Sequence, residues 1–190
     1  MQYCLLAAIS VAVGWSLPRE WPNVYGQWSD AFTVRRFWGR TYHQLLRRYT
    51  SSFGKMFCRL LNLQPGSWAS SYTQLYVGFA VSGLMHCAGD FMVSPSLLGA
   101  SFPFFAAQAV AISLEDAVID IAKRTDMKWP ELLVRGLGYA WVFAWLSLSV
   151  PWYINWSVKA GVIDTDRVPF SLITLLVPSA KTGAVSFATA

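Results

Sequence analysis

Residues 60–89 carry no Asp, Glu, Lys or Arg, and this uncharged run constrains the fold more than any other feature of the chain. Within it, residues 70–90 form an apolar stretch long enough to cross a bilayer, because about 20 residues at about 1.5 Å each cover a hydrocarbon core about 30 Å thick. His86 stands near the far end of the stretch. Polar groups at membrane depth are costly, and those that persist usually face a cavity, a partner or a reaction path. His86 is therefore the first candidate functional residue; the alternative is a neutral imidazole hydrogen-bonded to a neighbouring helix.

The composition is that of a polytopic membrane protein. Of 190 residues, 55% are hydrophobic and only 13% are charged, whereas about a quarter of an ordinary soluble domain is charged. The net charge of +5 does not indicate nucleic-acid binding, because eight of the fifteen Lys and Arg residues are concentrated in residues 18–69. Such a loop is typical of a membrane-facing or anion-binding segment. The three cysteines form no CxxC pair, so neither a disulfide framework nor a zinc or other metal site is indicated.

Further apolar segments predict an all-α, polytopic transmembrane bundle of about four or five spans in a single membrane domain, residues 1–190. Residues 1–18 are uncharged, residues 97–121 are apolar as far as Glu115, and residues 136–158 are uncharged. Residues 168–180 are apolar but too short to span a membrane with certainty. Lys and Arg flank the central span on one side only, which by the positive-inside rule puts the loop of residues 18–69 in the cytosol and the turn at 91–96 on the opposite side.

Residues 35–49 predict an amphipathic helix lying in the membrane interface. Basic side chains recur at helical spacing along one stripe, formed by Arg36, Arg40, His43 and Arg47, and aromatic and aliphatic side chains repeat on the opposite side. A second interfacial helix is predicted at residues 53–61, with apolar side chains on one face and Lys55 and Arg59 on the other. Anchoring to anionic lipid would explain both helices without any chemistry. A histidine inside an arginine stripe, however, points to a reaction or a polar partner.

Two blocks in this order resemble a known family. Residues 37–44 read FWGRTYHQ, and residues 81–86, at the end of an apolar helix, read VSGLMH. This arrangement resembles the wax synthase branch of the membrane-bound O-acyltransferases, in which an FWGR block precedes a helix ending in SG-x-x-H. The segment AAQAVAISLEDA at residues 106–117 is also similar to the segment that follows the histidine helix. The resemblance covers about residues 30–150, and the chain looks like the carboxyl-terminal half of that fold.

The resemblance implies an enzyme that transfers an acyl group, acetyl in the fungal members, from acyl-CoA to a hydroxyl of a lipophilic acceptor. It places the catalytic histidine at His86 and the second polar position at His43. It further implies a multi-pass protein of the endoplasmic reticulum membrane, acting in the biosynthesis of secondary metabolites such as terpenoids, with acyl-CoA as a co-substrate and no bound cofactor. The alternative is a non-catalytic, shortened relative that binds lipid or another subunit.

The residues themselves suit this chemistry. Imidazole is a suitable general base near neutral pH, and Ser82 and Asp90, one turn before and after His86, are the candidates to orient its ring. Arginine matches phosphate oxygens in paired hydrogen bonds, so Arg36, Arg40 and Arg47 are predicted to bind the phosphates of coenzyme A. Glu115 is interpreted as a carboxylate that reaches the membrane surface at the cytosolic end of its helix.

Overall fold

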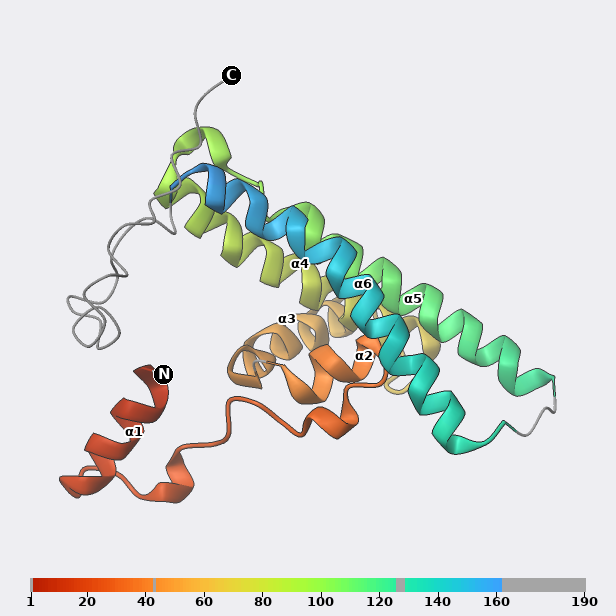
Figure 1. Ribbon diagram of the computed structural model, residues 1–190, viewed down its shortest axis with the longest axis horizontal. Helices are drawn as coiled ribbons and strands as arrows, with labels where there is room; N and C mark the ends of the chain where they lie inside the picture. The colour runs from red at the N-terminus through yellow and green to blue at the C-terminus, as the bar shows by residue number, and fades with distance from the viewer. Residues whose placement is uncertain (1, 43, 126–128, 162–190) are drawn as a thin grey trace, which may run out of the picture.

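The computed structural model describes residues 2–42, 44–125 and 129–161, and every regular element in these ranges is helical. Six α-helices are labelled in Figure 1: α1 Gln2–Ala12, α2 Val34–Arg36, α3 Arg47–Leu60, α4 Trp68–Val93, α5 Phe102–Arg124 and α6 Glu131–Lys159. Short 3-10 turns lie at Pro18–Glu20, Trp28–Asp30, Gln44–Leu46 and Pro95–Leu97, and a π-helical turn at Phe37–Thr41. The prediction of an all-α protein is confirmed.

Three helical segments are long and apolar enough to cross a membrane: Trp68–Val93, Pro95–Arg124 and Glu131–Lys159. They confirm the three central predicted spans. Residues 1–18, predicted to form a membrane helix or the remnant of one, contain α1, an apolar helix of 11 residues that is shorter than the three candidate spans. Residues 168–180 lie outside the described residues. The described part of the chain therefore contains three candidate spans, and the protein is an integral membrane protein by this measure.

The long helices α4, α5 and α6 run alongside one another, with α2 and α3 against their flank and α1 set apart (Figure 1). Contacts join α3 to α4, α4 to α5, and α5 to α6. Two glycines allow the close approaches. A Cβ on Gly54 of α3 would lie 3.0 Å from the Gln74 Cα atom, and one on Gly83 of α4 would lie 2.9 Å from the ring of Phe102. Small residues at helix crossings are a common packing device in membrane bundles.

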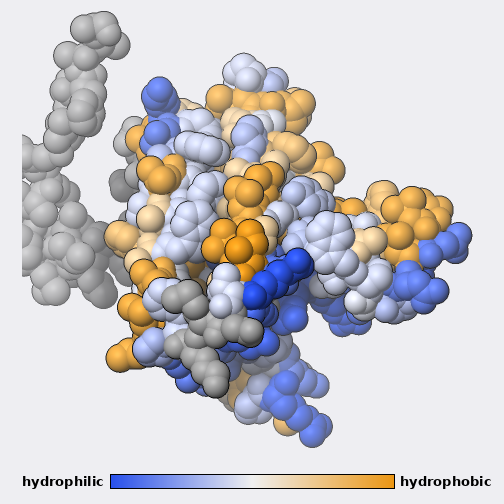
Figure 2. Space-filling model, turned by 90° about the vertical axis from the view of Figure 1, so that its right-hand side faces the viewer, coloured by the Kyte–Doolittle hydropathy of each residue, from blue (hydrophilic) through white to orange (hydrophobic). Residues whose placement is uncertain are grey.

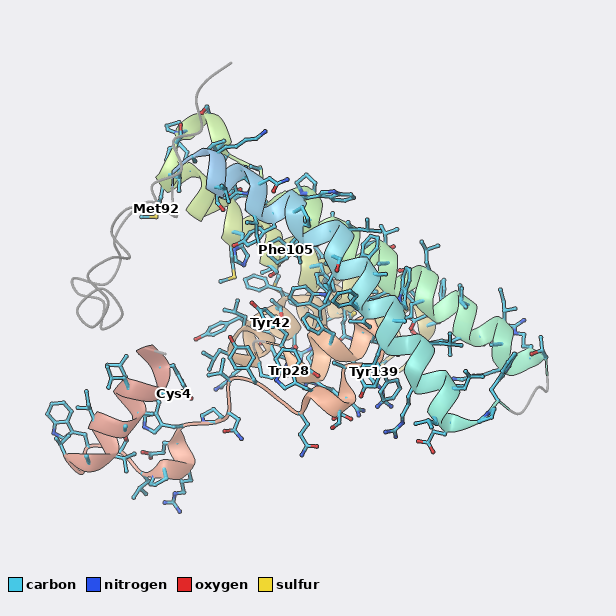
Figure 3. All side chains as sticks on the ribbon, viewed as in Figure 1. Cys4, Trp28, Tyr42, Met92, Phe105 and Tyr139 are labelled. Atoms are coloured by element: carbon cyan, nitrogen blue, oxygen red, sulfur yellow. The ribbon has the colours of Figure 1, made fainter. Side chains whose placement is uncertain are left out.

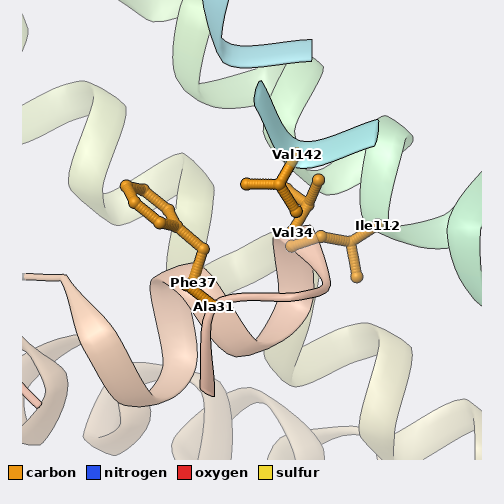
Figure 4. Packing of buried hydrophobic residues seen from close by; sticks show 5 residues of the cluster. All are labelled: Ala31, Val34, Phe37, Ile112 and Val142. Carbon is orange, nitrogen blue, oxygen red and sulfur yellow. The ribbon is translucent and has the colours of Figure 1, made fainter. Parts of the chain in front are cut away.

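A small apolar core ties the segment around α2 to the spanning helices. Ala31, Val34 and Phe37 pack against Ile112 of α5 and Val142 of α6 (Figure 4). All five side chains are at most 9% exposed. This core fixes the start of the FWGR block, at Phe37, beside α5 and α6.

Much of the remaining surface of the spans is apolar and exposed. Only 17% of the most apolar window of α4 and 11% of that of α6 is buried within the described structure, and Figure 2 shows apolar side chains over much of one face. Exposed apolar area on this scale is typical of a surface that meets lipid or other protein. The surface thus agrees with the membrane class predicted from composition.

The single interfacial helix predicted at residues 35–49 is wrong. The chain leaves the helical conformation at Tyr42, whose backbone is extended at φ −92° and ψ 132°. The cause is a competing backbone interaction: Gly26 N–H donates to Thr41 C=O at 2.9 Å, and Gln44 N–H donates to Val24 C=O at 2.7 Å. The preceding segment thus takes the hydrogen bonds that a continuous helix would use. As a result, Arg36, Arg40 and Arg47 do not share one helical stripe.

The helix predicted at residues 53–61 is confirmed as part of α3, Arg47–Leu60, and its place at the membrane interface stays a prediction. Its buried face, which includes Gly54 and Cys58, packs on α4. An apolar face formed by Phe53, Met56, Phe57 and Leu60 is exposed, and Lys55 and Arg59 stand on the other exposed side. This division into a packed, an apolar and a basic face is suited to a helix lying at the membrane surface.

Candidate functional site

A cavity of about 600 Å³ lies between the FWGR block, α3, α4, α5 and α6. His86 lines it, together with aromatic side chains from several of these elements, such as Trp38, Phe79 and Phe104. Phe105 and Tyr42, which also line the cavity, are labelled in Figure 3. The volume is within the range of small-molecule sites, which are mostly apolar with a few placed polar groups.

His86 is held by two aromatic side chains. Its ring stacks on Phe105, with centroids 4.4 Å apart and planes 16° from parallel. Its Nδ1 atom lies 3.2 Å from the Tyr153 hydroxyl of α6. Phe105 is itself buried, so the imidazole is packed against a fixed surface while one edge faces the cavity. His86 thus lines the cavity and also makes the contact with a neighbouring helix that the alternative interpretation expects, so its catalytic role stays a prediction.

One face of α4 forms a wall of the cavity. Gln74, Gly78, Ser82 and His86, spaced four residues apart, all line it, and from the first to the last the helix rises about 18 Å. Gly78 opens the middle of this wall, since the nearest atom to a Cβ built there is Thr50 Cβ at 3.9 Å. A narrow substrate chain could therefore pass along α4 between its polar start and His86.

Among the predicted coenzyme A arginines, Arg47 lines the cavity and is exposed. Its guanidinium donates to the Gln44 side chain at 3.4 Å. Arg36 lies over the Phe32 ring, 4.2 Å from the centroid, and pairs with Asp30 at 3.7 Å. Arg40 is exposed, and neither it nor Arg36 is among the residues lining this cavity. The structure therefore brings Arg47, but not the other two, to the cavity.

A further arginine, Arg35, also lines the cavity, although the sequence pattern did not suggest it. Its guanidinium makes a two-point ion pair with Asp116, which also accepts from the Tyr72 hydroxyl at 3.0 Å. Hydrogen bonding and charge attraction from Asp116 raise the pKa of Arg35 above its usual value. Because its guanidinium is already paired with Asp116, Arg35 is anchored in the protein rather than available to a ligand.

His43 lies outside the described residues, so its proximity to His86 stays a prediction. Its neighbour Tyr42 lines the cavity and stacks on Phe37, with centroids 5.4 Å apart. Burial raises the pKa of Tyr42, with a smaller contribution from Tyr25. Tyr42 is therefore neutral at physiological pH and presents an uncharged hydroxyl.

Comparison with known proteins shows a similarity to one family. Residues 21–107, which include the FWGR block and the histidine helix, match the model of the membrane bound O-acyl transferase family. Over this segment the chain is similar to the membrane-bound O-acyltransferase family. This match confirms the resemblance to the membrane-bound O-acyltransferases that the sequence indicated. No solved structure was found to match the chain.

The similar curated proteins are fungal acetyltransferases. Acetyltransferase ple2 of Rhodocybe pseudopiperita is 43% identical over 178 residues, which are 90% of this chain and 45% of that protein. Acetyltransferase eriL of Hericium erinaceus is 36% identical over 174 residues, 90% of this chain and 44% of that protein. Acetyltransferase sirH of Leptosphaeria maculans is 38% identical over 175 residues, 91% of this chain and 43% of that protein. The chain thus spans somewhat less than half the length of these acyltransferases.

Gln108 links the FWGR block to α6, a role that sequence reasoning missed. Its side-chain oxygen accepts from the indole N–H groups of Trp38 at 3.2 Å and Trp145 at 2.8 Å. Its amide nitrogen donates to Phe104 C=O at 3.2 Å and Ser149 Oγ at 3.3 Å. Gln108 is fully buried, and a buried amide with all these partners fixes the position of its neighbours. Trp38 is one of the neighbours held in the cavity wall.

The interpretation of Glu115 as a surface-reaching carboxylate is wrong, because its side chain is buried. It accepts from the backbone N–H groups of Val34 at 2.7 Å and Arg35 at 3.2 Å, and from the Trp141 indole at 3.0 Å. A carboxylate is stabilised at a helix N-terminus by such donors and by the helix dipole. Glu115 therefore anchors the first turn of the FWGR-bearing segment to α5 and α6.

Asp90 has a structural role at a helix junction. It is buried and accepts from Ser101 N–H at 2.8 Å and Ser101 Oγ at 2.5 Å, thereby joining the end of α4 to the start of α5. Ser82 lines the cavity, and Tyr153 makes a polar contact with the His86 ring. In the sequence, Tyr153 belongs to an aromatic run typical of interface anchoring, and nothing in the pattern joins it to a histidine 67 residues away.

Among the described residues, no group of three or more His, Cys, Asp or Glu side chains could hold a metal ion.

Proposed function

We propose that the protein is an O-acyltransferase that transfers an acetyl group from acetyl-CoA to a hydroxyl of a lipophilic acceptor. The observation that carries this proposal is the placement of His86 in the wall of a cavity that also reaches the exposed Arg47. The cavity offers a base and a cation to the two ends of an acyl-CoA substrate, whose reacting thioester and phosphates lie far apart. The acetyltransferase names of the relatives support acetyl as the transferred group.

His86 is the proposed general base. It accepts the proton of the acceptor hydroxyl as the oxygen attacks the thioester carbonyl, giving a tetrahedral intermediate. Collapse of that intermediate breaks the C–S bond, and the departing thiolate takes the proton from the imidazolium, which yields the ester and free coenzyme A. The mostly apolar lining of the cavity favours this transfer over hydrolysis, because it limits the access of water. His43 is proposed as the second polar residue, donating a hydrogen bond to the carbonyl oxygen as charge develops on it.

Arg47 is proposed to bind the phosphates of coenzyme A at the outer end of the cavity, since its guanidinium is exposed there. Arg40, exposed in the π-helical turn Phe37–Thr41, is proposed as a weaker, peripheral contact. Arg36 has the least capacity for such a role, because Asp30 and Phe32 already engage it.

The proposed acceptor is a lipophilic alcohol, such as a terpenoid or a fatty alcohol, supplied from the bilayer. The apolar side chains that surround His86 in the cavity support an acceptor of this class. The endoplasmic reticulum is the proposed location, in line with a membrane-embedded enzyme of secondary metabolism.

The proposal is tested by expressing the chain in microsomal membranes and supplying labelled acetyl-CoA or palmitoyl-CoA with a panel of terpenoid and fatty alcohols. Formation of a labelled ester from acetyl-CoA, above that of membranes carrying His86→Ala, is the expected result. Equal ester formation in the two membranes, or none with any donor and acceptor in the panel, would contradict catalysis by this chain.

A further inference from the structure

The Tyr153 hydroxyl and the imidazole of His86 are brought together by helices distant in sequence. Tyr153 lies on α6, and its hydroxyl oxygen is 3.2 Å from His86 Nδ1. The phenol ring is held by Phe104 and Phe105, with centroids 5.4 Å and 5.8 Å away. Because Phe105 also stacks on the imidazole, one buried ring sets the position of both partners.

The direction of this hydrogen bond decides whether His86 can act as a base. A neutral imidazole carries its hydrogen on one ring nitrogen and a proton-accepting lone pair on the other. If Nδ1 carries the hydrogen, it donates to the phenol oxygen, and Nε2 is the nitrogen that can accept a proton. If the phenol donates to Nδ1 instead, Nε2 carries the hydrogen and cannot accept another.

We propose that Tyr153 is a positioning residue whose hydroxyl oxygen accepts the Nδ1 hydrogen of His86 and thereby keeps Nε2 as the proton-accepting nitrogen. The same bond persists after Nε2 takes up a proton, since both nitrogens of an imidazolium are donors. Tyr153 acts through His86 and needs no contact with either substrate. This role rests on the proposed function, in which His86 is the base.

The tautomer can be measured without turnover. In the chain labelled with ¹⁵N-histidine and reconstituted in bilayers, the two histidines are told apart by comparison with His86→Ala. We expect a protonated Nδ1 and an unprotonated Nε2 at His86, and a higher fraction of the Nε2-protonated form in Tyr153→Phe, which keeps the ring but removes the hydroxyl. Tyr76→Phe is the matched control, because it removes a hydroxyl that pairs with Ser113 at 3.1 Å and lies outside this cavity. An unchanged tautomer in Tyr153→Phe, or an Nε2-protonated ring in the wild type, would overturn the proposal.

A kinetic measurement separates positioning from substrate binding and from folding. Tyr153→Phe should lower kcat per folded molecule about tenfold or more, as loss of a residue that orients a reactive imidazole often does, and leave the KM for acetyl-CoA within about twofold. Tyr76→Phe should keep both values. A raised KM with unchanged kcat would show that Tyr153 binds substrate, against the proposal. If the wild type transfers no acetyl group, the proposed function fails, whereas the tautomer measurement still decides whether Tyr153 sets the tautomer of His86.

Discussion

At the scale of single residues, His86 is the group on which the chemistry depends. Replacing it with alanine removes the base and leaves α4 more apolar, so the helix should still insert in the membrane. We expect acetyl transfer to fall about a hundredfold or more, the usual cost of losing a general base. The measurement is initial rate divided by the amount of protein recovered in carbonate-washed membranes. A rate near that of the wild type would remove His86 from the reaction.

Arg47 and its neighbour Arg48 allow a matched test of coenzyme A binding. Both are exposed at the start of α3, but only Arg47 lines the cavity. Arg47→Ala should raise the KM for acetyl-CoA by about tenfold, because a charge-assisted contact to phosphate is worth about 1.5–3 kcal/mol before solvent screening reduces it. Arg48→Ala should change KM little. Parallel loss of activity and membrane retention in both variants would favour lipid anchoring as the role of these arginines.

The residue scale also shows where sequence reasoning ends. His86 could be predicted because a polar group in an uncharged span is conspicuous. Tyr153 and Glu115 could not, because their roles come from contacts with residues 67 and 81 positions away. Aromatic residues near a membrane surface and acidic residues near a helix end have ordinary local explanations. Only tertiary packing shows that Tyr153 contacts the His86 ring and that Glu115 binds the backbone of the FWGR-bearing segment.

At the scale of elements, the spans were predictable and the interfacial segment was only partly so. A run of about 20 apolar residues has few alternatives to a helix in lipid, because every backbone group must be paired internally. Residues 35–49 have no such constraint. Their helical periodicity is real, but the hydrogen bonds from Gly26 N–H to Thr41 C=O and from Gln44 N–H to Val24 C=O stop the helix at Tyr42. Periodicity shows which side chains are apolar, and it does not show that a preceding segment competes for the backbone hydrogen bonds.

Two glycines of α4 should respond differently to the same substitution. Gly83→Ala places a methyl group 2.9 Å from the Phe102 ring and 3.3 Å from Phe105 Cβ, so it should push α4 away from α5 and lower the thermal unfolding midpoint in detergent. Gly78→Ala meets only Thr50 Cβ, at 3.9 Å, and should leave that midpoint unchanged. It narrows the cavity instead.

A narrower cavity should lower the rate of acetyl transfer. Gly78→Ala, and more strongly Gly78→Leu, should reduce acetyl transfer while the protein remains folded, because the added carbons enter the wall between the ends of the cavity. Rates per folded molecule and unfolding midpoints, measured on the same preparations, test this. Full activity in Gly78→Leu would show that no substrate passes along this face of α4.

At the scale of the whole molecule, the arrangement of spans predicts which ends share a side of the membrane. Helix α4 has 26 residues, about 39 Å at about 1.5 Å per residue, so its two ends lie on opposite sides of the hydrocarbon core. Helix α5 returns, which brings Lys123 and Arg124 to the same side as α3. The basic residues of α3 and of this end of α5 then face one compartment, and the positive-inside rule makes it the cytosol.

Single cysteines test this topology in a background in which Cys4, Cys58 and Cys87 are replaced by serine or alanine. Ser52→Cys lies on the exposed side of α3, and Ser96→Cys lies in the exposed turn between α4 and α5. In sealed microsomes, whose cytosolic face is outward, a membrane-impermeant maleimide should label the cysteine at position 52 directly. It should label the one at position 96 only after permeabilisation, because the charge of the reagent keeps it out of the hydrocarbon core. Labelling of both cysteines without permeabilisation would contradict α4 as a span. If only the cysteine at position 96 is labelled before permeabilisation, the orientation is the opposite of the one predicted. The Arg47 end of the cavity would then lie on the side of the membrane away from cytosolic acetyl-CoA.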